Sequence, residues 1–437
     1  MGWDYIIARY FVLNPLRFFF DHICWYYAYF YMNNKFMSYV ACDCQPCHLN
    51  IVVDRNYKYG NRDDEILDII SPTGPNVEHK GPLIYAHGGG WVCVNRELLM
   101  QSITPFIRAG YTVYIIDYPL APENKFPMPL ISTLRAISWV KRHTGHESVT
   151  LLGDSAGGNL MTMAAALIYN KTLLNQFNQT LVDYDVNYYH KNNINVWDYP
   201  LVNHVVSIYG VLDQTHHLNK TRNEELMKHM NFIERFFFKA QISILNFCFY
   251  SYRHPNDKDF FDGILTLGDL LQREDENGGN VIRNYPPLFL ACSRQDPLIS
   301  HTVYIHDIMN NKINNNQFQC EMFICDGIHS FHGLPIHLTF GYWKSQSFLA
   351  TKHILNYITN GRIQLELDEN IVVNFDFGLF FYLFFLLFGI FWLSSFIIYI
   401  LNSFQYIVKI CMVILFFAII CSRYILKRRR EGEGKKE

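Results

Sequence analysis

The sequence LLGDSAGGNL, residues 151–160, is a short apolar run that ends at Gly153 and continues as a segment rich in Ala, Leu and Met. The run predicts a buried strand, and the segment after it predicts a helix. Residues 153–157 therefore show the pattern G-x-S-x-G at a strand-to-helix turn. A serine at such a turn adopts strained backbone geometry and presents its hydroxyl above the sheet, near the positive end of the helix. Ser155 is accordingly a candidate nucleophile.

Apolar runs of the same kind recur through the middle of the chain. They are short, rich in β-branched and aromatic residues and bounded by turns, at 82–90, 112–118, 149–155, 205–210, 288–293 and 318–327. Helical patterns lie among them at 130–143, 159–170 and 302–313. Such alternation predicts a mostly parallel central sheet with helices on both faces. We expect one α/β domain over residues 50–365.

Two stretches interrupt this alternation. Residues 171–199 are polar and rich in Asn and Tyr, and we expect a surface insertion there without a core of its own. Residues 213–285 contain an apolar helical run and no strand pattern, which suits a helical cap over the end of the sheet. The aromatic face of this cap either lines an apolar pocket or serves ordinary packing, and the sequence leaves both open.

His87-Gly88-Gly89-Gly90-Trp91 follows an earlier predicted strand. Glycines leave backbone N–H groups unobstructed, so that several can point at one developing oxyanion. We assign the candidate oxyanion hole to Gly88, Gly89, Gly90 and Ala156, with Gly88 mainly shaping the turn and the other three donating. His87 is expected to hold the loop by hydrogen bonds. A phosphate-binding turn is the alternative, but no Lys-Ser/Thr follows to complete one.

A serine nucleophile needs a base, and the base needs an acid that orients it. Asp296 comes just beyond the predicted strand 288–293, and His329 comes just beyond 318–327. Because parallel strands end at the same edge of a sheet, we expect both to meet Ser155 there, in the chain order serine, acid, histidine. Asp326 is the rival acid and His332 the rival base.

Both ends of the chain contain long apolar stretches. Residues 375–401 and 406–426 are each near the length that spans a bilayer, and we expect one or two transmembrane helices over 375–426. Two buried core helices are the alternative. The basic tail 427–437 should stay cytoplasmic, but the number of spans, and hence the side of the membrane that carries the domain, stays open. Residues 1–48 hold a shorter aromatic run that suits a membrane interface better than a cleaved signal peptide.

Charge and cysteine content bear on other classes of protein. A formal net charge of −2 gives no general reason to expect nucleic acid as a partner. Cys42, Cys44, Cys47 and His48 lie close together, and zinc binding, S-acylation and unmodified thiols are the alternatives. Their spacing is not that of a standard zinc finger, so we expect neither a metal nor another cofactor.

Five motifs in order resemble the hormone-sensitive-lipase-like branch of the α/β-hydrolases: HGGGW, DYPLAPENKFP at 117–127, GDSAGGNL, DPL and DGIHSFHG. Within that branch the chain is most similar to the membrane-anchored arylacetamide deacetylase and neutral cholesterol ester hydrolase group. The resemblance covers about residues 80–360 and implies an α/β-hydrolase fold and a catalytic triad of Ser155, Asp296 and His329. Two positions depart from it. Pro119 replaces an arginine, and Ser132 lies in the region of a customary acidic residue.

The resemblance and the apolar ends together predict a membrane-anchored serine carboxylic ester hydrolase. Its expected substrate is a small apolar ester or a lipid, and its expected location is the endoplasmic reticulum or another endomembrane. The alternative is a non-catalytic protein that binds a hydrophobic ligand on the same fold. The sequence does not indicate an oligomeric state.

Overall fold

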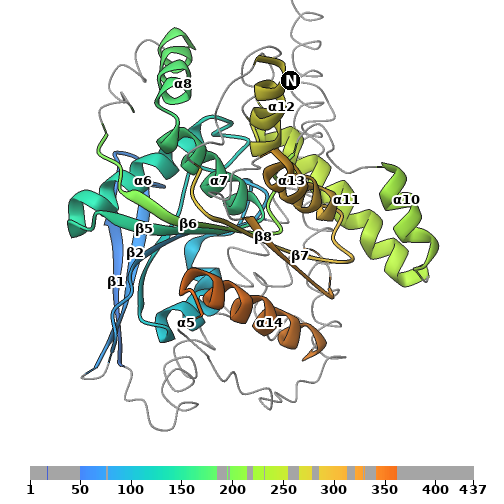
Figure 1. Cartoon of the computed structure of the whole chain (residues 1–437), viewed down its shortest axis with the longest axis horizontal. Coiled ribbons are helices and arrows are strands. Elements are labelled where there is room, and N and C mark those ends of the chain that lie inside the picture. Colours follow the sequence, from blue (N-terminus) through green and yellow to red (C-terminus); the bar gives the residue numbers. More distant parts are fainter. Residues whose placement is uncertain are drawn as a thin grey trace, which may run out of the picture. The chain divides into compact units, whose positions relative to one another are not determined.

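One eight-stranded sheet forms the centre of the part of the chain that the computed structural model describes (Figure 1). The described residues are 17, 50–74, 77–184, 194, 197–213, 220–230, 232–253, 265–277, 285–312, 320–327, 329 and 341–361. The strands are β1 (Asn50–Lys58), β2 (Ile66–Thr73), β3 (Gly81–Ala86), β4 (Tyr111–Ile116), β5 (Ser148–Asp154), β6 (Leu201–Ile208), β7 (Leu288–Ser293) and β8 (Cys320–Cys325).

The strands are arranged in the order β1-β2-β4-β3-β5-β6-β7-β8. The pairs β1–β2 and β2–β4 are antiparallel, whereas the pairs from β4–β3 to β7–β8 are parallel. The predicted, mostly parallel sheet is thus confirmed. The antiparallel hairpin β1–β2 was not predicted, because β1 is mostly exposed and β2 carries the buried charge of Asp68 in its middle, so neither strand has a clean apolar pattern.

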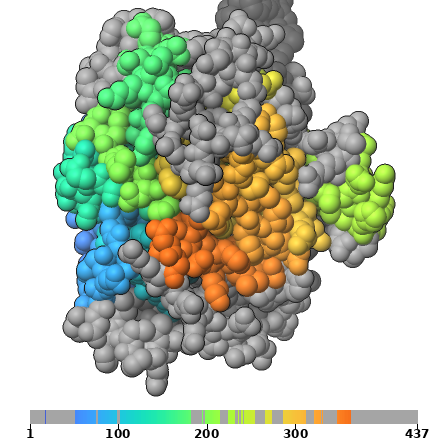
Figure 2. All heavy atoms as spheres, in the orientation of Figure 1, coloured from blue at the N-terminus to red at the C-terminus, as the bar shows by residue number. Residues whose placement is uncertain are grey.

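Helices cover both faces of the sheet, as expected (Figure 1). They are η4 (Arg96–Leu99), α5 (Met100–Arg108), α6 (Met128–Thr144), α7 (Ala156–Tyr169), α8 (Lys171–Tyr184), α10 (Lys220–Lys228), α11 (Phe232–Tyr252), α12 (Leu267–Asn277), α13 (Ile299–Lys312) and α14 (Gly341–Ile358). Helices α5 and α14 lie on one face, and α6, α7 and α13 lie on the other (Figure 1). The described elements between 213 and 285 are the helices α10, α11 and α12. Figure 2 shows α10, in lime green, at the margin of the view, where several of its side chains are exposed.

The core lies between the sheet and these helices, and it includes residues that the sequence placed at the surface. Residues 171–184 of the predicted insertion form α8, which packs against α7. Leu173, Phe177 and Leu181 of α8 are buried in the main core. Residues 171–184 of the expected surface insertion therefore do not stand apart from the domain, because their apolar side chains fall on one helical face and join its main core although the stretch is polar on average.

The predicted membrane segments are not part of this description. Among the helices of the described residues, none combines the length and the apolar character that a membrane span requires. The predicted spans at 375–426, the basic tail 427–437 and nearly all of residues 1–48 lie outside the described residues.

Candidate active site

Ser155 lies at the turn between β5 and α7, at the carboxyl end of a central strand. Its backbone angles, φ 49° and ψ −114°, are ones that residues with side chains rarely adopt. The turn is tight, because a Cβ atom on Gly157 would overlap the backbone carbonyl of Ala86. The Ser155 amide donates to the Ile208 carbonyl at 2.8 Å, which fixes the turn to β6.

Ser155, His329 and Asp296 form one chain of contacts at this edge of the sheet. The Oγ atom of Ser155 lies 3.0 Å from Nε2 of His329, and Nδ1 of His329 lies 2.9 Å from Oδ2 of Asp296. Asp296 is fully buried, and its Oδ1 accepts the Leu298 amide at 2.7 Å. A carboxylate at Nδ1 selects the tautomer that leaves Nε2 able to accept a proton from the serine.

The rival residues are not part of this chain of contacts. Asp326 accepts a hydrogen bond from Nε of Arg294 at 2.9 Å, and its side chain is 54% exposed. The carboxylate in contact with His329 is that of Asp296. His332 lies outside the described residues.

The loop after β3 carries the candidate oxyanion donors. The amide of Gly88 donates to Oδ1 of Asp154, the residue before Ser155, at 2.8 Å. Because this amide is already engaged, Gly88 is removed from the candidate oxyanion hole and has a structural role in the turn. Among the described residues, the amides of Gly89 and Gly90 meet no hydrogen-bond acceptor, and Ala156 is the first residue of α7, whose amide has no partner within the helix.

His87 has the structural role expected of it, because its side chain contacts the backbone of this loop. The side chain is buried, and its Nδ1 lies 2.7 Å from the carbonyl oxygen of Gly88. The imidazole stacks on the ring of Tyr118, with centroids 4.4 Å apart. The Tyr118 hydroxyl donates to the His87 carbonyl at 2.7 Å.

The side chain of Asp154 connects the turn at Ser155 with the glycine loop and, through Tyr209, with His329. The sequence analysis did not predict this role. Besides the Gly88 amide, its Oδ1 accepts the Tyr85 hydroxyl at 2.7 Å. The Tyr209 hydroxyl lies 3.4 Å from Oδ2, and the Tyr209 ring meets the His329 ring edge-on at 4.9 Å. Burial raises the pKa of Asp154, while the hydrogen bond from Tyr85 opposes that rise. The signal in the sequence was the acid directly before the candidate nucleophile.

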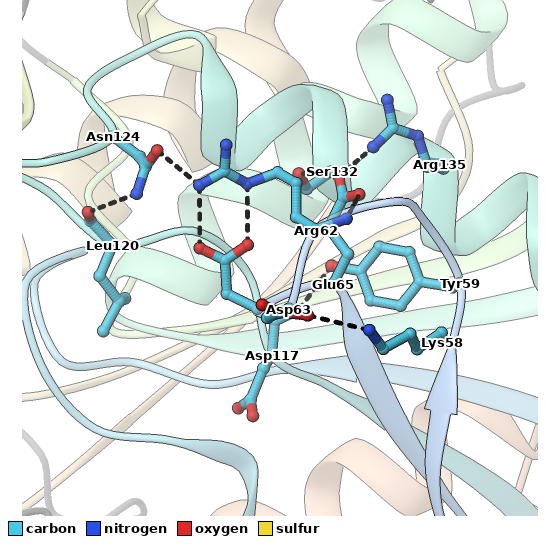
Figure 3. Close-up of polar contacts among 11 residues, drawn as sticks. Lys58, Tyr59, Arg62, Asp63, Glu65, Asp117, Leu120, Asn124, Ser132 and Arg135 are labelled. Carbon is cyan, nitrogen blue, oxygen red and sulfur yellow. Dashed lines mark hydrogen bonds and ion pairs between the residues drawn. The ribbon is translucent and has the colours of Figure 1, made fainter.

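Figure 3 shows polar contacts between the β1–β2 hairpin, the loop after β4 and α6. Glu65, at the end of the hairpin turn, is fully buried and forms an ion pair with Arg135. Its carboxylate also accepts a hydrogen bond from Oγ of Ser132 at 2.7 Å. The buried carboxylate of Glu65 thus has two partners on α6, Arg135 and Ser132.

The described residues contain no group of three or more His, Cys, Asp or Glu side chains that could hold a metal ion. Cys42, Cys44, Cys47 and His48, the cluster considered for zinc, lie outside the described residues.

Comparison with known proteins shows the family of this chain. Residues 83–333 match the family described as alpha/beta hydrolase fold. The chain is 31% identical over 110 residues to an alpha/beta hydrolase of Acanthamoeba polyphaga mimivirus, which covers 24% of this chain and 32% of the viral protein. It is 33% identical over 121 residues to hormone-sensitive lipase of Mus musculus, which covers 23% of this chain and 15% of the lipase.

These matches span a third or less of either relative's length. A solved structure from work on two fungal esterases of Rhizomucor miehei has a TM-score of 0.50 at 16% identity and covers 76% of this chain and 90% of the fungal chain. That likeness concerns the fold alone. With its sequence match extending over 83–333, more than half of its length, this chain belongs to the family of alpha/beta-hydrolase-fold proteins.

Proposed function

We propose that this protein is a serine hydrolase of carboxylic esters that works through an acyl-enzyme. The observation that carries the proposal is the contact chain of Ser155 Oγ, His329 Nε2, His329 Nδ1 and Asp296 Oδ2, with separations of 3.0 Å and 2.9 Å. The esterases and lipases among its relatives support the same reaction class.

Acylation begins at Ser155. His329 Nε2 accepts the hydroxyl proton while Oγ attacks the ester carbonyl, and Asp296 stabilises the imidazolium that forms. The carbonyl oxygen becomes negative, and the amides of Gly89, Gly90 and Ala156 donate hydrogen bonds to it. One such donor contributes about 2.7–4 kcal/mol to lowering the barrier. Collapse of the tetrahedral intermediate breaks the ester bond, and the leaving alcohol takes the proton from His329.

Deacylation repeats these steps with water. His329 accepts a proton from the water as its oxygen attacks the acyl carbonyl, and the same amides stabilise the second oxyanion. The bond between Oγ of Ser155 and the acyl carbon then breaks, His329 returns the proton to Oγ, and the acid leaves. Because Asp296 is buried and bound to the Leu298 amide as well as to His329, it keeps the imidazole in one orientation through both halves.

The proposed substrate is a small apolar ester or a lipid, and the proposed location is the membrane of the endoplasmic reticulum or another endomembrane. Two observations support this part. The cap helix α11 is rich in aromatic residues, and the apolar runs at 375–401 and 406–426 suit a tether. The resemblance to the membrane-anchored arylacetamide deacetylase group agrees with it.

The activity is tested with a fluorophosphonate probe and with p-nitrophenyl acetate and butyrate. We expect the wild type to label and to hydrolyse both esters, and Ser155→Ala to do neither, with kcat lower by about 10⁴-fold or more. Ser148→Ala, at the opposite end of β5, is the matched control and should behave as the wild type. A folded wild type that neither labels nor cleaves would favour the non-catalytic binder.

The tether is tested separately by deleting residues 371–437. We expect the shortened protein to move from the membrane to the soluble fraction and to keep its activity on p-nitrophenyl butyrate. Recovery of the shortened protein in the membrane fraction would contradict attachment through residues 371–437 alone, and deleting residues 1–48 as well would then test the aromatic N-terminal run. Loss of activity in a folded, soluble product would show that these residues do more than anchor.

A further inference from the structure

The loop that carries the candidate oxyanion donors has an unusual backbone. Gly89, Gly90 and Trp91 have φ angles of 99°, 60° and 61°, and Val94, three residues on, has 75°. Glycine adopts such angles freely, but tryptophan and the β-branched valine do so only at a cost in conformational energy. Such a conformation persists where surrounding contacts hold it in place. We therefore expect contacts from other segments of the chain to stabilise the backbone conformation of this loop.

The last turns of the cap helix α11 supply those contacts. The ring of Tyr252 stacks on that of Trp91, with centroids 4.1 Å apart and planes within 1° of parallel, and both residues are buried. Cys248, one turn earlier, lies directly against Gly90, because a Cβ atom built on Gly90 would stand 2.5 Å from its Sγ. The Phe249 ring lies 6.3 Å from Trp91. One end of α11 thus packs on two consecutive residues of the loop.

Hydrogen bonds fix both partners of this stack to a third segment. The carbonyl of Trp91 accepts the Ala121 amide at 2.7 Å. The carbonyl of Tyr252 accepts the Phe126 amide at 2.9 Å, and the Phe126 ring meets that of Tyr252 edge-on at 5.7 Å. The loop at Trp91, the end of α11 and the segment 117–127 are therefore held together by contacts between each pair. The rings of Trp91 and Tyr252 hold the stack by packing, because neither Nε1 of Trp91 nor the Tyr252 hydroxyl has a hydrogen-bond partner in the described part of the chain.

We propose that Tyr252, supported by Cys248, is a positioning residue for the oxyanion hole. It acts through Trp91 and Gly90 and touches no reacting atom in this role. The stack holds the left-handed conformation of residues 89–91 and so aims the amides of Gly89 and Gly90. Through this contact, helix α11 sets the strength of transition-state stabilisation. This inference rests on the proposed ester hydrolysis.

Loss of the stack should act on the transition state rather than on substrate binding. A donor that drifts by a fraction of an ångström still admits substrate but stabilises the oxyanion less well. For Tyr252→Ala we expect kcat for p-nitrophenyl butyrate to fall by about 10- to 100-fold, with KM changed by less than about threefold. A trifluoromethyl ketone, which forms an oxyanion on Ser155, should bind more weakly by the same factor as kcat falls.

Two variants serve as comparisons in the full-length protein. Tyr250→Ala removes the same side chain two residues away on α11, where it is 75% exposed, and should keep the wild-type kcat. Tyr252→Phe retains the ring and loses only the hydroxyl, and should recover most of the kcat that Tyr252→Ala loses. Thermal unfolding monitors folding throughout. If Tyr252→Ala does not fold, Tyr252→Leu takes its place, since it fills much of the space without stacking.

The outcomes separate the two proposals. A wild type without esterase activity overturns the proposed function, and this inference with it. An active wild type in which folded Tyr252→Ala or Tyr252→Leu retains the kcat of Tyr250→Ala overturns the inference alone. So does a loss that appears only in KM, or one that leaves the affinity for the trifluoromethyl ketone unchanged. A parallel loss of kcat and ketone affinity, recovered in Tyr252→Phe, supports the inference.

Discussion

Tyr85→Phe removes one hydroxyl from the buried network beneath the candidate nucleophile and leaves the aromatic ring in place. That hydroxyl donates to Oδ1 of Asp154 at 2.7 Å, and both residues are buried. A hydrogen bond to a charged group stabilises a protein by about 1.5–3 kcal/mol. We expect Tyr85→Phe to lower the free energy of unfolding by that amount.

Tyr209→Phe is the matched control on the same carboxylate. The Tyr209 hydroxyl lies 3.4 Å from Oδ2, beyond the usual range for an O–H···O bond, so its coupling to Asp154 in a double-mutant cycle should be weaker than that of Tyr85. Adding Asp154→Asn to Tyr85→Phe completes a double-mutant cycle. The effect of Tyr85→Phe should shrink in that background, because the acceptor is no longer ionisable.

The effect should also depend on pH. Burial raises the pKa of Asp154, and the Tyr85 hydrogen bond opposes that rise, so Tyr85→Phe moves the folded pKa further up. A group with a raised folded pKa contributes stability that is complete below its unfolded pKa, about 3.9, and is lost as pH rises through the folded pKa. In Tyr85→Phe this loss of stability extends to a higher pH than in the wild type. The substitution should therefore lower the free energy of unfolding more at pH 8 than at pH 4.5.

Urea unfolding of the purified protein, followed by tryptophan fluorescence at both pH values, measures these differences. The reasoning fails if, at pH 8, the coupling of Tyr85 to Asp154 is no larger than that of Tyr209 to Asp154. It also fails if the cost of Tyr85→Phe is the same at both pH values, because the hydroxyl would then not interact with an ionising carboxylate.

Three further predictions concern other parts of the fold. Arg135→Met leaves the fully buried Glu65 carboxylate without its cation and should cost about 3–5 kcal/mol in urea unfolding, whereas adding Glu65→Gln should restore part of that loss. Burial lowers the pKa of His204, so its contribution to stability is present above its unfolded pKa of about 6.5 and is lost as pH falls through the folded value. The advantage of the wild type over His204→Gln in urea unfolding should therefore shrink between pH 8 and pH 5. In Gly157→Ala the new Cβ atom would overlap the carbonyl of Ala86. We expect the esterase activity of the folded fraction to fall by about 100-fold or more. A stable variant with full activity would contradict the tight turn.

The sequence alone predicted the elements whose signals are local. The apolar runs that became β3, β4, β5 and β7 are nearly continuous, because strands buried on both faces of a sheet need apolar side chains on both. The turn at Ser155 was readable because G-x-S-x-G is a contiguous pattern between a strand and a helix. Asp296 and His329 could be named from the sequence because each directly follows one of these strands.

Contacts between distant segments settled the rest. Asp296 and Asp326 both follow strands, and only the folded chain shows which carboxylate touches His329. The sequence indicated that Gly88 shapes the turn, but only the folded chain shows that its amide donates to Asp154, 66 residues away.

The hairpin β1–β2, the buried face of α8 and the stack of Tyr252 on Trp91 were likewise absent from the prediction. Each depends on a partner that no local pattern specifies. A sequence shows which groups need to be buried or paired, but the partner of each is set by the packing of the whole domain.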